Sequence, residues 1–127
     1  MEKQTGKKNV VLYYRVSKDT SDGSILKSQQ KKLQNYAEKN GYTIVEEIGE
    51  VSPGTRLRRK GIRRVYQLAY NKSMDAVLVG SSSQIARPLS LFIKFCNKLK
   101  EYGVETESPN EGSLYELCKH FKSGLFK

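Results

Sequence analysis

Short apolar runs of strand length alternate along this chain with longer amphipathic stretches, and this alternation is the strongest constraint on its fold. The runs are NVVLYY (9–14), YTIVEEIGE (42–50) and MDAVLVGS (74–81), with a less apolar one, VETES, at 104–108. The first run is β-branched, aliphatic or aromatic apart from its asparagine, which is typical of a buried strand. Strands that alternate with helices form βαβ units, so we predict an α/β fold with a mainly parallel four-stranded sheet flanked by helices.

The stretches between the runs carry apolar residues at helical spacing. Helices are expected over 25–41, from the basic cluster RLRRKGIRR (56–64) onward, and over 91–103, with a closing helix over 113–122. Gly41 and Gly103 supply the residues that end two of them. The apolar faces expected to meet the sheet are Leu26, Leu33, Tyr36 and Ala37; Ile62, Val65, Tyr66 and Ala69; and Phe92, Phe95, Cys96 and Leu99.

Length and cysteine content limit the organisation of the chain. Its 127 residues suffice for one compact domain but not for two, so we expect a basic tail (1–8) and a single domain (9–127). No apolar run approaches the roughly 20 residues that span a bilayer, so no membrane association is expected. Cys96 and Cys118 have neither zinc-ligand nor redox spacing, which favours reduced thiols in the cytoplasm.

The charge of the chain indicates a polyanionic partner. Its 23 basic and 13 acidic residues give a formal net charge of +10. Six of the nine residues in RLRRKGIRR (56–64) are basic and none is acidic. This basic segment could be a solubilising surface, but its density favours contact with a polyanion such as nucleic acid or an anionic membrane face. The residues assigned to DNA binding are Arg56, Arg58, Lys60, Arg63 and Arg64.

Polar segments follow the first three predicted strands. Arg15 and Ser17 end the first, VSPGT (51–55) and the basic segment follow the second, and SSSQIAR (81–87) follows the third. The carboxyl ends of parallel strands meet at one edge of a sheet, where ligands collect. A serine hydroxyl among arginines suits attack on a phosphodiester, because guanidinium groups bind phosphate and stabilise its developing charge. No suitably placed histidine or acidic cluster suggests a base or metal, so no cofactor is expected.

Four segments, in order, resemble the serine recombinases, the resolvase and invertase family. YYRVSKD (13–19) is similar to the family signature Y-x-R-V-S, and Gln29 with KKLQNYA resembles its Q-x-x-x-L stretch. VSPGTRLRRKGI (51–62) is similar to the family's mobile loop, and MDAVLVGSSSQIAR (74–87) to the strand that leads into D-R-L-x-R. The likeness covers about residues 9–106.

The resemblance implies a resolvase-like catalytic domain that cleaves and exchanges DNA strands. In such a domain Ser17 forms a phosphoserine link to DNA, Arg15 binds the phosphate and Gln29 helps to arrange the site. It also implies that DNA, an oligomer of this chain or a related recombinase is a partner, and that the source is a mobile element or phage. The catalytic residues carried over are Ser17, Arg15, Arg59, Arg87 and Gln29, with Arg58 as the competing register for Arg59.

The chain departs from the family at the D-R-L-x-R motif. Ser83 replaces the acid and Gln84 replaces the first arginine, whereas Arg87 is retained. A glutamine amide can donate hydrogen bonds to phosphate but lacks the guanidinium charge. We also expect no dimerisation helix or DNA-binding domain, so that specific DNA recognition would come from a partner or be absent.

Alternatives without chemistry exist for each site residue. Ser17 could cap a local turn, Arg15 could project from a strand end, Gln29 could be an exposed helix residue, and Arg87 could pair with an acid. Two hypotheses therefore stand: an enzyme that cleaves DNA, and a degenerate module that binds and regulates a recombinase or another protein. A protein that binds DNA through charge alone would explain the +10 but not the order of the motifs.

Overall fold

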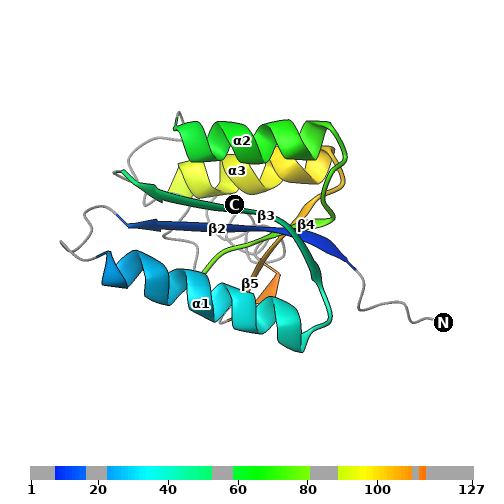
Figure 1. The fold of residues 1–127 in the computed structure, drawn as a ribbon. Helices are drawn as coiled ribbons and strands as arrows, with labels where there is room; N and C mark the ends of the chain where they lie inside the picture. Colours follow the sequence, from blue (N-terminus) through cyan, green and yellow to red (C-terminus); the bar gives the residue numbers. More distant parts are fainter. Residues whose placement is uncertain (1–7, 17–22, 53–58, 81–88, 110–111, 114–127) are drawn as a thin grey trace.

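The computed structural model describes residues 8–16, 23–52, 59–80, 89–109 and 112–113. Strands and helices alternate over these ranges, as the sequence predicts (Figure 1). The strands are β2 (Asn9–Val16), β3 (Thr43–Val51), β4 (Ala76–Leu78), β5 (Glu105–Ser108) and β6 (Gly112–Ser113). The helices are α1 (Ser24–Lys39), α2 (Lys60–Tyr70) and α3 (Leu89–Glu101).

The strands form one sheet in the order β3-β2-β4-β5-β6. β2 pairs in parallel with β3 and with β4, and β4 pairs in parallel with β5. These four strands confirm the predicted parallel sheet. β6 adds a two-residue antiparallel strand beside β5, which the sequence did not predict. The expected closing helix is wrong at its first residue, because Ser113 belongs to β6, and its remaining residues lie outside the described ranges.

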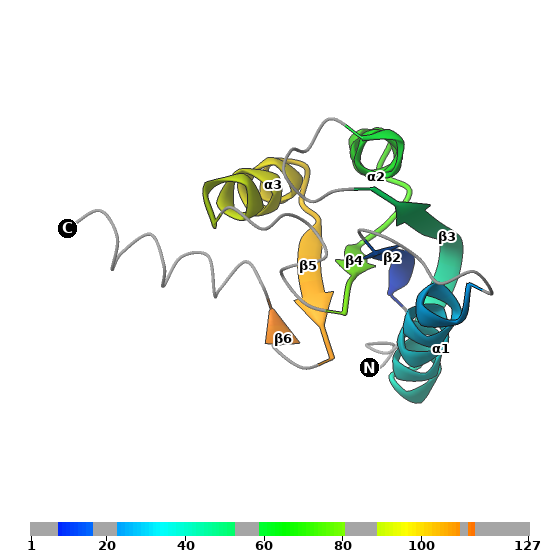
Figure 2. The same ribbon diagram turned by 90° about the vertical axis from the view of Figure 1, so that its left-hand side faces the viewer.

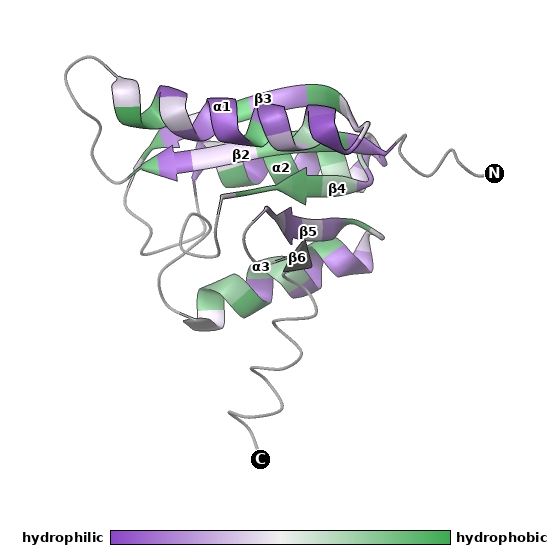
Figure 3. Ribbon diagram, turned by 90° about the horizontal axis from the view of Figure 1, so that it is seen from below, coloured by the Kyte–Doolittle hydropathy of each residue, from purple (hydrophilic) through white to green (hydrophobic). Residues whose placement is uncertain are grey.

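Helices cover both faces of the sheet: α1 lies on one face, and α2 and α3 lie together on the other (Figures 1 and 2). β2 is therefore buried on both sides, since its Val11 and Tyr13 pack toward α2 and α3 whereas its Leu12 and Tyr14 pack toward α1. Hydrophilic residues predominate along α1, as Figure 3 shows from that side of the sheet. The apolar side chains of the sheet form two core layers, one on each face.

The predicted apolar faces are confirmed. Every member of the α3 face is buried, and Leu26, Tyr36 and Tyr66 are partly buried against the two core layers. Gly41 and Gly103 have φ angles of 72° and 78°, so each adopts the left-handed conformation expected just after a helix. None of the helices in the described ranges is long and apolar enough to cross a membrane.

Phe95 and its neighbour Lys94 offer a matched test of this packing. Phe95 is fully buried between α3 and the sheet, and its ring centroid lies 5.8 Å from that of Tyr66, whereas Lys94 is exposed. Phe95→Ala is expected to lower the free energy of unfolding by about 3–5 kcal/mol in urea denaturation, because a large cavity is left. Lys94→Ala should change it by less than about 0.5 kcal/mol. Similar losses in both variants would contradict the assigned face.

Candidate active site at the carboxyl ends of the strands

Two buried arginines lie where β2 and β3 end and α2 begins. Arg15 is the second-to-last residue of β2 and is 5% exposed, and Arg59 directly precedes α2 and is 6% exposed. In the sheet, Arg15 lies opposite Glu50 of β3, and Glu50 in turn contacts Arg59. The fold thus brings together two of the predicted site residues around a carboxylate that the sequence analysis did not single out.

The Glu50 carboxylate is the acceptor for the groups around it. Its Oε2 accepts a hydrogen bond from Arg59 Nε at 3.1 Å and another from the Tyr13 hydroxyl. Arg59 Nη2 donates to the Tyr13 hydroxyl oxygen at 2.7 Å, which closes the triangle. The side chains of Arg59 and Glu50 are only 4% and 13% exposed. Water screens such a pair poorly, so its geometry is firmly set.

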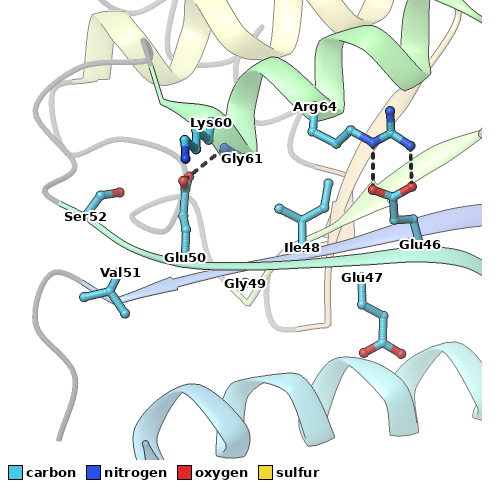
Figure 4. A pocket seen from close by; sticks show the side chains of 10 residues that line it. All are labelled: Glu46, Glu47, Ile48, Gly49, Glu50, Val51, Ser52, Lys60, Gly61 and Arg64. Carbon is cyan, nitrogen blue, oxygen red and sulfur yellow. Dashed lines mark hydrogen bonds and ion pairs between the residues drawn. The ribbon is translucent and has the colours of Figure 1, made fainter.

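Glu50 also caps the N-terminus of α2, because the residue at the N-cap position of this helix does not. Arg59, at the N-cap position, makes no side-chain capping bond, but Glu50 Oε1 accepts the backbone N–H of Gly61 at 3.0 Å (Figure 4). A carboxylate at a helix N-terminus is favourable because the first N–H groups are unpaired and carry partial positive charge. Position 61 must be small, since a Cβ there would lie 2.6 Å from Glu50 Oε2 and 2.9 Å from Tyr13 Cε1.

Tyr13 acts in this network as a neutral hydrogen-bond donor. Burial raises the pKa of Tyr13 far above its usual value, and its hydrogen bond to Glu50 raises it further, whereas Arg59 opposes both effects. The phenol therefore keeps its proton through the physiological range and donates it to the carboxylate. This excludes Tyr13 as a general base near neutral pH.

Arg15 is fixed by the backbone at the end of β3. Its Nη1 donates to the carbonyl oxygen of Ser52 at 2.6 Å. Because side chains alternate along a strand, Arg15 shares the face of Val11 and Tyr13, which is the face that α2 covers. The guanidinium groups of Arg15 and Arg59 are therefore supplied to the same face and the same edge of the sheet. Groups held in this way can bind an anion without reorganising first.

The other predicted site residues lie on helices or outside the described ranges. Gln29 lies in the second turn of α1 and is partly buried. Lys60, Arg63 and Arg64 are exposed on the first turns of α2. Arg64 is held by Glu46, whose carboxylate accepts from Nε at 2.7 Å and from Nη2 at 2.8 Å (Figure 4). The predicted residues that fall outside the described ranges are Ser17, Arg56, Arg58, Ser83, Gln84 and Arg87.

The alternation of side chains along β3 indicates that Glu50 points inward, although a glutamate is expected to be exposed. Along β3, Glu46, Ile48 and Glu50 alternate with residues of the other face and point toward α2, whereas Glu47 points toward α1 (Figure 4). Ile48 packs against the core on that face. A carboxylate two residues after a core-facing isoleucine is therefore directed inward, where an arginine can pair with it.

Comparison with known proteins gives consistent results. The family described as "Resolvase, N terminal domain" matches residues 10–123. The chain is similar to the C-terminal catalytic domain of ISC1926 TnpA, an IS607-like serine recombinase, with 29% identity and a TM-score of 0.73 over 91% of this chain and 78% of that one. No individually curated protein matches it.

Two more distant structures share the fold. The N-terminal catalytic domain of TP901-1 integrase is 21% identical, with a TM-score of 0.75 over 94% of this chain and 99% of that one. A resolvase family site-specific recombinase from Streptococcus pneumoniae is 20% identical, with a TM-score of 0.72 over 91% of this chain and 85% of that one. These likenesses extend over nearly all of the described sheet and helices.

Glu50 and Glu46 of β3 each pair with an arginine, the first in a buried site and the second in an exposed one. The same substitution should therefore change the stability of the protein by different amounts at the two positions. Glu50→Gln is expected to lower the free energy of unfolding in urea by about 3 kcal/mol, because the Arg59 guanidinium is left buried without its counter-charge. Glu46→Gln breaks an exposed pair with Arg64 and should leave the unfolding midpoint nearly unchanged. Equal effects would show that Glu50 does not anchor this edge.

Proposed function

The chain belongs to the resolvase N-terminal domain family of serine recombinases, and from this premise we propose that it cleaves DNA through a serine nucleophile. In the proposed step the Ser17 hydroxyl oxygen attacks the phosphorus of a phosphodiester, forming a phosphoserine bond. The bond from phosphorus to one deoxyribose oxygen breaks, and that oxygen takes up one proton in place of the proton that the serine hydroxyl loses, so that the step balances. The reverse step, with the hydroxyl of another strand as nucleophile, rejoins the DNA and releases Ser17.

The observation that best supports this proposal is the convergence of Arg15 and Arg59 at one edge. Both are buried, and both are held by named acceptors: the Ser52 carbonyl for Arg15, and Glu50 for Arg59. Phosphoryl transfer needs fixed cationic donors, because charge spreads over the oxygens that surround phosphorus as the bonds exchange. Ser17 follows Val16, the last residue of β2, and Arg15 lies just before that residue.

We assign distinct roles to the residues of the site. Ser17 is the nucleophile, and Arg15, Arg59 and Arg87 stabilise the phosphate, with Gln29 arranging the site from α1. Glu50 and Tyr13 are positioning residues, since they act on Arg59. In this scheme Arg59 stays bonded to Glu50 and Tyr13 while its guanidinium group also faces the phosphate. No metal ion or nucleotide cofactor has a role in this scheme.

DNA and other protein copies are the partners in this proposal. Lys60 and Arg63 are exposed at the start of α2, beside the proposed site, and suit contact with the phosphates that flank the one attacked. With them we assign Arg56 and Arg58. Arg64 contributes less, because Glu46 already engages it. Strand exchange requires more than one catalytic serine, so we propose that the chain acts in the cytoplasm as an oligomer or beside a related recombinase.

A regulatory module is the second candidate, and the residues at 83 and 84 favour it. Ser83 and Gln84 occupy the positions at which the family has an acid and an arginine. Loss of one preorganised donor lowers a rate by about 100- to 1,000-fold. In this reading the chain keeps the recombinase fold, cleaves poorly or not at all, and acts by binding a recombinase or another protein.

A covalent adduct with DNA tests the enzyme directly. The full chain would be incubated with a pool of labelled, randomised duplexes that each contain a nick, so that cleavage beside the nick releases a short fragment and traps the link. Wild-type protein is expected to give an adduct on a denaturing gel, and Ser17→Ala to give none. Ser28→Ala, an exposed serine of α1, is the matched control and should retain it. An adduct that survives Ser17→Ala would overturn the assigned nucleophile.

Restoring the family residues separates the two candidates. The double change Ser83→Asp with Gln84→Arg is expected to raise the yield of adduct about 100-fold, because it returns a cationic donor to the phosphate. Each single change is measured beside it in the same gel assay. If adduct is absent from wild type and from the double variant, the regulatory function is favoured.

A further inference from the structure

A shallow groove runs along the outward side of α2 and reaches the residue that follows α3. Two kinds of side chain dominate its lining, cationic and tyrosine, and none of the described residues that line it is acidic. We call it the tyrosine groove. Its cationic and aromatic members are Lys60, Arg63, Arg64, Tyr66, Tyr70 and Tyr102.

The tyrosine rings form an ordered surface. Tyr70 is 69% exposed, and its ring meets that of Tyr102 edge-on, with centroids 5.8 Å apart and an interplanar angle of 87°. The ammonium group of Lys98 lies 5.6 Å from the Tyr66 ring centroid and 5.8 Å from that of Tyr102, which holds these two rings around a cation. Tyr66 and Tyr102 thus share the Lys98 ammonium group, and Tyr70 offers apolar surface to solvent.

The cationic residues of the groove lie at the end that is nearest to the proposed active site. Lys60 and Arg63 occupy the first turn of α2, and Tyr70 is at its last residue. Lys60 and Arg64 line both the tyrosine groove and a second pocket that contains Glu50 and Ser52 (Figure 4). The groove is therefore continuous with the surface at the carboxyl ends of β2 and β3.

We propose that the tyrosine groove binds a single strand of nucleic acid that extends from the cleaved phosphodiester. Its phosphates contact Lys60 and Arg63, and one or two of its bases stack on Tyr70 and Tyr102. The tyrosine faces favour a single strand because every base has a π-face but a base within a duplex does not present it. This inference rests on the proposed function, since it names the path of the same DNA beyond the reacting phosphate.

The cations and rings together favour nucleic acid over an acidic protein segment. A carboxylate-rich peptide would pair with Lys60 and Arg63 but has no flat group to cover the exposed ring of Tyr70. A nucleotide strand supplies both an anion and a planar base in each repeat, so it can engage the cations at one end of the groove and the rings at the other. The formal net charge of +10 adds long-range attraction for either polyanion and does not decide between them.

Binding to a short labelled oligothymidine tests the proposal. It would be measured by fluorescence anisotropy with the full chain carrying Ser17→Ala, so that no covalent reaction contributes. Tyr70→Ala is expected to weaken binding roughly tenfold, and Tyr70→Phe to retain it, because stacking needs the ring and not the hydroxyl. Binding of a duplex of the same length should change less than twofold. Circular dichroism verifies that each variant is folded.

The role of the cationic residues in the groove is tested by the salt dependence of oligothymidine binding. Lys60→Gln and Arg63→Gln should each reduce the slope of log affinity against log salt concentration by about 0.7, since each removes one phosphate contact. Lys31→Gln and Lys32→Gln make the same change in net charge on exposed positions of α1, on the other face of the sheet, and should leave the slope unchanged. Equal changes in slope from both pairs would overturn the assignment of the groove.

Two results would reject the groove as a strand-binding site. One is wild-type affinity for oligothymidine in a folded Tyr70→Ala protein. The other is a loss of self-association or of polyglutamate binding in that variant with strand binding intact, which would identify a protein-binding surface. Failure of the proposed cleavage appears separately, as a missing adduct while oligothymidine binding still depends on Tyr70.

Discussion

The carboxylate of Glu50 joins three parts of the chain that are distant in sequence. One of its oxygens accepts from Tyr13 of β2 and from Arg59, and the other accepts from the first turn of α2. An unpaired carboxylate in this position would be costly, because water is largely excluded from it. The position of Arg59, the start of α2 and the small residue at position 61 all follow from satisfying that one charge.

The same contact links stability to the proposed chemistry. Arg59 neutralises Glu50 in the resting protein, and it is also the group proposed to face a phosphate. A phosphate would bring a second anion to a guanidinium that already has one, so the strength of the Glu50 bond would tune how strongly Arg59 attracts substrate. Arg15 is held at the same edge by the backbone, since it donates to the carbonyl oxygen of Ser52.

Much of the fold could be predicted because periodicity alone identifies an apolar face. The spacing of Phe92, Phe95, Cys96 and Leu99 predicted α3 and its buried side, since helical geometry determines which residues share a face. β6 could not be predicted in this way, because two residues have no period and their pairing depends on β5.

The order of the four family-like segments predicted Arg15 and Arg59 as site residues, and both lie at the expected edge. Their roles, and those of Ser17 and Arg87, stay predictions. Glu50 was missed because EEIGE reads as a solvent-facing strand, and its burial depends on Arg59, which folds over it from outside the strand.

β3 is the outermost strand on its side of the sheet, and its side chains alternate between two faces that both carry carboxylates. Glu46 and Glu50 lie toward α2, and Glu47 lies toward α1, where Gln30 and Gln34 donate to it. A second copy adding its own β3 to this edge would bring another set of carboxylates within a few ångströms, which disfavours continuation of the sheet from one molecule into the next. The lateral edge of β3 is thus protected against strand addition by the charges of its own side chains.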